Sequence, residues 1–128
     1  MKAKASKRPR PKLPPISEEM KQWSAILGQE LCQWPGVTSR PMFGMRGFYR
    51  DNKIFAALPV TRGFRTSNSL IFRIKPMPPE LLERAKKEPR IDTENRAPGT
   101  KWLVFELNSA EGLRDALWWL NQAYACAK

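Results

Sequence analysis

The stretch RPMFGMRGFYRDNKIFAALP, residues 40–59, decides the fold. Two strand-forming runs, MRGFY at 45–49 and KIFAAL at 53–58, flank the polar segment RDNK. Asp51 and Asn52 both tolerate turn conformations, so they predict a tight hairpin between these runs. The run before them, TSRPMF at 38–43, contains Pro41, which favours a strand at the edge or the start of a sheet. Because short hairpin connections join antiparallel strands, we expect an antiparallel sheet.

The two glycines of this stretch raise the question of a phosphate-binding loop. A Walker loop continues into Gly-Lys-Ser/Thr and opens a helix, and a dinucleotide fingerprint also needs a helix directly after its glycines. Here a strand and a hairpin follow instead. We therefore predict that Gly44 and Gly47 serve backbone geometry and packing, by accepting positive φ or by leaving room for a large neighbour.

Helical signals lie on both sides of the hairpin. Ser17 can cap a helix whose first turn holds Glu18 and Glu19. Apolar residues then recur at three- and four-residue steps and predict one buried face. They are Met20, Trp23, Ile26, Leu27 and Leu31. At the other end, Asn108 and Glu111 fit a capping box before a helix with an apolar stripe that includes Leu117 and Leu120.

The segment between the hairpin and the last helix alternates in type. SLIFRIK at 69–75 and KWLVFEL at 101–107 predict strands, a short helix lies within 76–89, and residues 90–100 form a polar loop. The predicted class is α+β. It has an antiparallel sheet of about five strands, an N-terminal helix, a short helix before the last strand and a C-terminal helix.

Charge divides the chain into a tail and a domain. The formal net charge is +11, and residues 1–12 carry six Lys or Arg and no acidic residue. We predict a disordered basic tail over residues 1–15 and a single domain over 16–128. Such a tail favours contact with nucleic acid or another polyanion. The alternative is a solubilising terminus, or in part a cloning remnant.

Composition argues against several classes of protein. No apolar run reaches the roughly 18 residues of a membrane helix, and no secretory signal follows the basic start. The chain has two cysteines and no histidine, so we expect no zinc site, no other metal, no cofactor and no disulfide framework. Cys32 and Cys126 are predicted to be buried or half-buried thiols in a reducing cytoplasm.

Short motifs give the chain a resemblance to a known family. MFG at 42–44, GFY at 47–49, KIFAAL at 53–58 and the closing LNQAYACA resemble the N-terminal domain of TfoX/Sxy-type proteins, which shares its plan with YjbR/MmcQ-like domains. The resemblance covers roughly residues 17–126. It implies a small bacterial, cytoplasmic α+β domain, linked through TfoX to the regulation of competence and through the YjbR-like group to DNA binding. It implies no catalytic site, and the chain lacks the second helical domain of TfoX.

Catalysis is not expected from the residues either. Without histidine the usual general base is missing, and Cys32 has no activating partner that the sequence shows. Asp92 and Glu94 lie together in a loop, where carboxylates are usually solvated. We therefore predict a protein that is not an enzyme.

A candidate nucleic-acid site follows from alternation along the hairpin. With a two-residue turn, Phe48 pairs with Phe55, and one face carries cations between aromatic rings. Cations meet phosphates and rings stack on bases, so this face and the basic side of the next strand predict contact with DNA or RNA. The predicted residues are Arg46, Phe48, Arg50, Lys53, Phe55, Arg73 and Lys75. In the alternative, a helix covers both phenylalanines and the arginines lie at the rim.

Two functions stay open at this point. The first is a nucleic-acid-associated or regulatory binding domain, indicated by the basic tail and the hairpin face. The second is a protein-interaction module or homodimer, indicated by Trp118 and Trp119 in the closing helix, which otherwise belong to the core. Burial of both phenylalanines would make the hairpin face structural and favour the second function.

Overall fold

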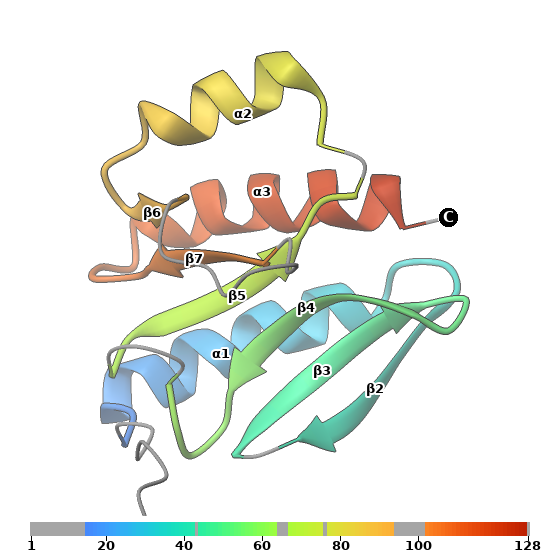
Figure 1. Cartoon of the computed structure of the whole chain (residues 1–128). Helices are drawn as coiled ribbons and strands as arrows, with labels where there is room; N and C mark the ends of the chain where they lie inside the picture. The colour runs from blue at the N-terminus through green and yellow to red at the C-terminus, as the bar shows by residue number, and fades with distance from the viewer. Residues whose placement is uncertain (1–14, 43, 64–66, 76, 94–101, 128) are drawn as a thin grey trace, which may run out of the picture.

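The computed structural model describes residues 15–42, 44–63, 67–75, 77–93 and 102–127. Its three helices and six strands follow one another as α1 Glu18–Cys32, β2 Val37–Met42, β3 Met45–Arg50, β4 Lys53–Pro59, β5 Ser69–Arg73, α2 Pro79–Lys86, β6 Ile91–Asp92, β7 Trp102–Glu106 and α3 Gly112–Cys126 (Figure 1). The strands form one antiparallel sheet in the order β2-β3-β4-β5-β7-β6. The predicted α+β class is confirmed. The strand that the sequence did not predict is β6, two residues long, within the predicted polar loop.

The β3–β4 hairpin has the turn that the sequence predicts. Asp51 and Asn52 have φ angles of 50° and 73°, and Arg50 pairs with Lys53. Two consecutive positive φ angles match the twist of the flanking strands, which is why Asp and Asn suit these positions. The preceding strand, β2, lies at the edge of the sheet, as Pro41 indicated.

The hairpin register differs from the prediction by one residue. Tyr49 pairs with Ile54, but Phe48 pairs with Ala56, so Phe55 is an extra residue on β4. Such a bulge locally breaks the two-residue alternation of side chains. Phe55 and Ala56 therefore both belong to the core on one face of the sheet, together with Phe48. The expected pairing of Phe48 with Phe55 is wrong.

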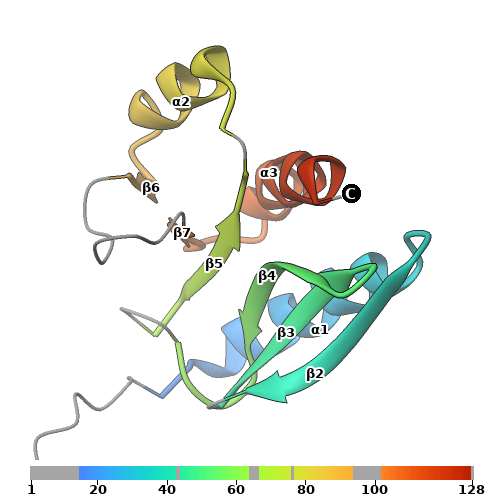
Figure 2. The ribbon, with the colours of Figure 1, turned by 45° about the vertical axis from the view of Figure 1, so that its right-hand side comes forward.

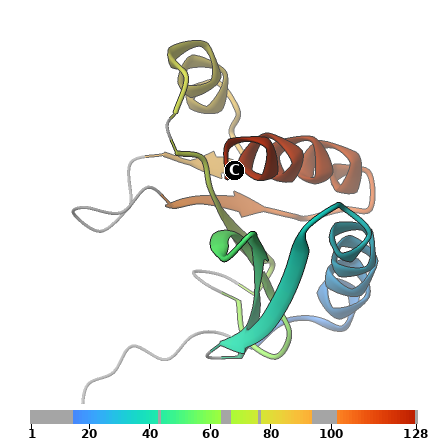
Figure 3. The same cartoon turned by 90° about the vertical axis from the view of Figure 1, so that its right-hand side faces the viewer.

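Two helices cover that face. Figures 2 and 3 show α1 and α3 on the same side of the sheet. Helix α2 lies next to β6, at the edge of the sheet that is far from the hairpin. The core between these helices and the sheet contains Met20, Leu27, Leu31, Phe48, Phe55, Phe72, Phe105, Trp119 and Leu120. None of the three described helices lies on the opposite face (Figure 3).

Helix α1 begins as predicted and differs in one apolar position. The hydroxyl of Ser17 accepts a hydrogen bond from the backbone N–H of Met20 at 3.1 Å, which caps the first turn. Leu27 and Leu31 are fully buried and Trp23 is half-buried, but Ile26 is 50% exposed. The buried stripe is therefore narrower than predicted.

Helix α3 departs from its predicted start. It begins at Gly112 after Glu111, and no side chain caps it, so the capping box at Asn108 is absent. Leu120 is fully buried, as predicted, whereas Leu117 is half-buried at the rim. Trp119 is 3% exposed, and the half-buried Trp118 packs edge-on against it with ring centroids 4.9 Å apart.

The two glycines of the hairpin region serve geometry, as expected. Gly44 has a φ of +80°, and its carbonyl accepts backbone N–H groups of Val60, Thr61 and Arg62 at 2.9–3.1 Å. Gly47 has no such φ. A Cβ there would lie 2.8 Å from Met42 Sδ, so Gly47 leaves room on the sheet.

Ion pairs join the segment between α2 and β6 to the first turn of α3. The Arg90 guanidinium donates to the Glu88 carboxylate at 2.7 and 2.8 Å and to Asp115 Oδ2 at 2.9 Å. The hydrogen bond from Arg90 lowers the pKa of Glu88, although burial of the carboxyl opposes this. The same contacts raise the pKa of Arg90. The chain just after α2 is thus tied to the first turn of α3.

The predicted tail lies mostly outside the described residues. Residues 1–14 are not described, but Pro15, the last residue of the predicted tail, pairs with Arg62 in an isolated bridge. The backbone N–H of Ile16 donates to the carbonyl of Thr61 at 3.2 Å.

Within the described ranges, no helix has the length and apolar character that crossing a bilayer requires.

Gly44→Ala should lower the free energy of unfolding by about 1–3 kcal/mol, because alanine resists positive φ and its Cβ would lie 2.7 Å from Arg62 Cγ. Gly28→Ala is the matched control. Its Cβ would meet Phe48 Cζ at an ordinary 3.4 Å, and alanine favours the helix by about 0.5–1 kcal/mol. Urea unfolding of both variants measures the difference. Equal effects of the two substitutions would contradict this role for Gly44.

Glu88→Gln should reduce stability by about 1 kcal/mol near neutral pH. A carboxylate whose pKa is lowered in the fold stabilises the protein above its ordinary pKa, and this contribution is lost as the pH falls through the lowered pKa. The parent and variant should therefore converge in acid. Thermal unfolding across this pH range tests it, with Glu83→Gln on the exposed side of α2 as the control. A difference that persists at low pH would rule out the ion pair as its cause.

Candidate nucleic-acid interface

The aromatic part of the predicted interface is buried. Phe48 is 2% and Phe55 is 0% exposed, and both lie in the core beneath α1 and α3. Neither ring can stack on a base in this fold. The structure corresponds to the alternative in which helices cover the phenylalanines, because the bulge adds Phe55 and Ala56 to the same apolar surface as Phe48.

Arg50 lies at the rim of this core and has a structural partner. Its Nη1 donates to the carbonyl of Tyr124 at 2.9 Å, and its guanidinium carbon lies 4.1 Å from the Tyr124 ring centroid. That carbonyl belongs to the last turn of α3, where the helix dipole favours a cation. Tyr124 in turn packs against Phe55 and Trp34, with centroids 5.7 and 5.1 Å apart. Arg50 therefore holds the hairpin to α3.

Arg46 and Lys53 are exposed at opposite ends of the hairpin. Arg46 Nε donates to the hydroxyl of Ser39 on β2 at 2.8 Å. Arg46 lines a groove beside α1, and Lys53 lines a different groove. The five predicted residues of the hairpin thus do not form one binding surface.

The groove at Lys53 brings three of the predicted cations together. It lies between the hairpin turn, the end of β5 and the end of α3, and has a volume of about 610 Å³. Its described lining consists of Tyr49, Asn52, Lys53, Ile54, Arg73, Lys75, Cys126 and Ala127. Among these eight residues three are cationic and none is acidic. We call it the basic groove.

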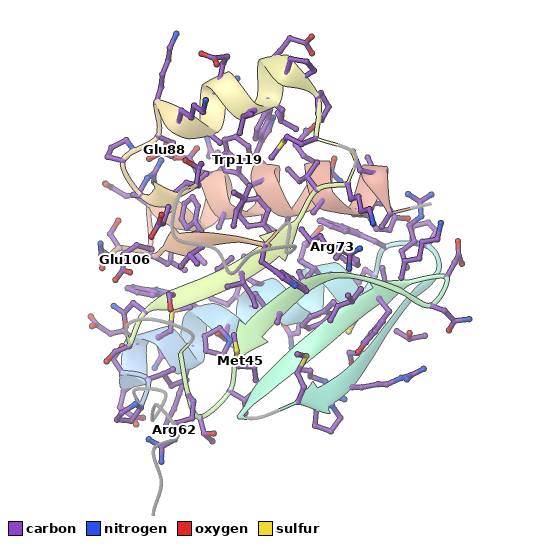
Figure 4. The ribbon with its side chains drawn as sticks, in the orientation of Figure 1. Met45, Arg62, Arg73, Glu88, Glu106 and Trp119 are labelled. Atoms are coloured by element: carbon purple, nitrogen blue, oxygen red, sulfur yellow. The ribbon has the colours of Figure 1, made fainter. Side chains whose placement is uncertain are left out.

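The basic groove opens beside the face of the sheet that carries no described helix. Arg73 lies on that face in Figure 4, and alternation along β5 places Ile71 on the same side. The middle of the face is a small buried cluster of Met45, Ala57, Ile71 and Val104, with Met42 and Trp102 packed at its border. Ligand contacts on this face would thus come from the polar and aromatic side chains around the cluster.

Two side chains at the border of this face were not predicted as site residues. Tyr49 lies under Arg40, whose guanidinium carbon is 5.1 Å from the ring centroid, and Trp102 pairs with Arg73 across the β5–β7 ladder. Alternation did separate Tyr49 from Phe48. Nothing local to the hairpin, however, shows which of the two faces the distant α3 covers.

Two acidic side chains on this face, Glu106 and Asp92, lie away from the basic groove, whereas Asp51 in the hairpin turn is next to its lining residue Asn52. Glu106 pairs with Ser69 at the opposite end of β5 from Arg73, as Figure 4 shows. Asp92 lies on β6, at the far edge of the sheet from the hairpin. The face therefore has a basic end near the hairpin and an acidic end near β6.

The metal-ligating and nucleophilic side chains of the described residues are dispersed. No three His, Cys, Asp or Glu side chains gather there as a metal site would require. Cys32 is exposed, which corrects the prediction of a buried thiol, and Cys126 is half-buried in the basic groove. Both cysteines are free. Glu94 lies outside the described residues, so its proximity to Asp92 stays a prediction.

Arg50→Ala should lower the free energy of unfolding by about 1–3 kcal/mol, since it removes a charge-assisted hydrogen bond and the cover of the Tyr124 ring. Arg46→Ala removes the same charge from an exposed position and should change stability by less than about 0.5 kcal/mol. Chemical denaturation measures both. A variant of Arg50 as stable as that of Arg46 would show that the contact with α3 is dispensable.

Neither a family model, nor a curated protein, nor a solved structure matches this chain. The resemblance to the TfoX N-terminal domain therefore stays a prediction that rests on short sequence motifs.

Proposed function

We propose that the protein is a non-enzymatic binding domain that associates with nucleic acid through the basic groove. The observation that carries the proposal is the meeting of Lys53, Arg73 and Lys75 around one groove whose described lining holds no acid. Closely spaced cations with no carboxylate among them attract phosphate groups, and the salt-dependent release of counterions supplies most of the affinity.

The charge of the whole chain supports the same class of ligand. The formal net charge of +11 raises the local concentration of any polyanion and speeds its association. The TfoX-like resemblance also favours a regulatory, nucleic-acid-associated role in the cytoplasm of a bacterium. The tail, with six cations in its first twelve residues, would add contacts without sequence specificity.

The alternative function, an interaction module or homodimer, was suggested by Trp118 and Trp119, and the structure gives both rings partners within the chain. Trp119 is buried, and Arg84 of α2 covers Trp118, with its guanidinium carbon 4.2 Å from the ring centroid. Trp119 thus packs inside the molecule, and Trp118 is half-buried in contact with Trp119 and Arg84. Burial of Phe48 and Phe55 makes their face structural and favours the alternative on that point, but Lys53, Arg73 and Lys75 line the basic groove without them.

The triple variant Lys53→Ala, Arg73→Ala, Lys75→Ala tests the proposal. It should weaken binding to DNA and RNA, and should reduce the slope of log K against log salt by up to about 2–3, because up to three phosphate contacts are lost. Anisotropy titrations at two or more salt concentrations measure both quantities. The fold should stay intact, since exposed or half-buried cations of this kind contribute little to stability.

The matched control removes the same charge elsewhere. Lys86→Ala, Lys87→Ala, Arg114→Ala takes three exposed cations from the last residue of α2, its C-cap and α3 and should leave most of the affinity in place. If both triple variants lose affinity equally, net charge alone explains the binding and the basic groove is not the site. If neither variant changes it, the proposal fails, and light scattering should then decide whether the chain associates with itself.

A further inference from the structure

We infer that the ligand of this face is a single-stranded nucleic acid, whose bases stack on the Arg40–Tyr49 pair and on Trp102. The inference rests on the proposed function and specifies the kind of nucleic acid. It comes from the position of two aromatic rings relative to the basic groove, and from the charge on the described helices.

The strand register puts the two rings on the same face of the sheet, toward the same end of the strands. Phe48 pairs with Ala56, Ala56 with Phe72, and Phe72 with Leu103, all on the helix-covered face. One residue further along the strands come Tyr49 on β3, Arg73 on β5 and Trp102 on β7, while on β4 the extra residue Phe55 precedes Ile54, the partner of Tyr49. By alternation Tyr49, Arg73 and Trp102 lie on the opposite face.

The side chains on this face combine aromatic rings with cations, as surfaces that bind single strands do. Tyr49 and Trp102 are both half-buried, and β4 and β5 separate their strands. Arg73 lies between them, and Lys53 and Lys75 line the groove beside it. Arg40 covers the Tyr49 ring at 5.1 Å, and a guanidinium plane can itself stack on a base. The face thus carries both aromatic rings, on which bases can stack, and cations, which can bind phosphates.

Single strands fit this surface because their bases are free to stack, whereas in a duplex the bases are stacked on one another. A protein that reads duplex DNA usually places a helix with basic residues in the major groove. The exposed side of α1 carries Glu18, Glu19 and Glu30 against Lys21. On α3 the exposed charges are Arg114 and Asp115, which cancel. α2 has eight residues, and its two cations, Arg84 and Lys86, are balanced by Glu80 and Glu83.

The test compares one oligonucleotide of mixed sequence as a single strand and as an annealed duplex, at two salt concentrations. The parent protein should bind the single strand at least about tenfold more tightly. Tyr49→Ala and Trp102→Ala should each weaken single-strand binding by about 5- to 150-fold, as expected for the loss of one stacked base. Their salt dependence should stay that of the parent, because no phosphate contact is removed.

Conservative variants separate stacking from a loss of folding. Tyr49→Phe and Trp102→Phe keep a ring and should retain most of the single-strand affinity. Trp102→Phe should also lose part of the tryptophan quenching that single-strand binding produces in the parent, a readout that needs no disruptive substitution. Quenching unchanged in Trp102→Phe would show that no base meets Trp102.

The outcomes distinguish this inference from the proposed function. If the duplex binds as tightly as the single strand, or the alanine variants bind like the parent, while the Lys53, Arg73, Lys75 triple variant still loses affinity, the stacking inference is overturned and the proposed function stands. If the triple variant binds both forms like the parent, the proposed function fails, and this inference with it.

Discussion

The extra residue at Phe55 sets the arrangement of the rest of the molecule. It lets Phe55 and Ala56 join Phe48 on one face of the hairpin, and so makes that face apolar enough to hold α1 and α3. Tyr124 and Trp34 then pack on Phe55 from two helix ends that are far apart in sequence. Without the bulge, strict alternation would put Ala56 and Leu58 on the side opposite Phe48 and divide the apolar residues between both faces. The separation of one helix-covered face from one without helices thus begins in a single irregularity of β4.

Local chemistry was sufficient to predict most of the helices and strands, but it could not predict which face of the sheet the helices cover. The Asp51–Asn52 turn and the Ser17 cap depend on neighbouring residues only, so the sequence predicts both correctly. Strand β6 is two residues long and exists because β7 offers it a partner, which no local pattern reveals. The start of α3 at Gly112 likewise follows from the backbone path after β7, which the Asn108 motif did not determine.

The candidate site shows the same division between local and distant information. The sequence identified Lys53, Arg73 and Lys75 as basic positions beside strand ends, and the fold brings these three to one groove. It could not show that Arg50 would meet the carbonyl of Tyr124, a residue 74 positions away, or that the helices would cover Phe48. Arg50 donates to a carbonyl at the end of α3, and Arg73 lines the basic groove. The sequence does not distinguish them, because both belong to strands in which polar and apolar residues are mixed. Their roles differ through partners supplied by another element.

The two borders of the sheet have a consequence for how the molecule behaves at high concentration. An exposed strand can template the addition of a strand from another molecule, which leads to aggregation. Here the outermost strand on one side, β2, contains Pro41, which has no N–H to offer, and the outermost described strand on the other, β6, has only two residues. Both borders are poor templates for such growth. The protein should therefore have little tendency to polymerise through its strands, even where many copies lie close together.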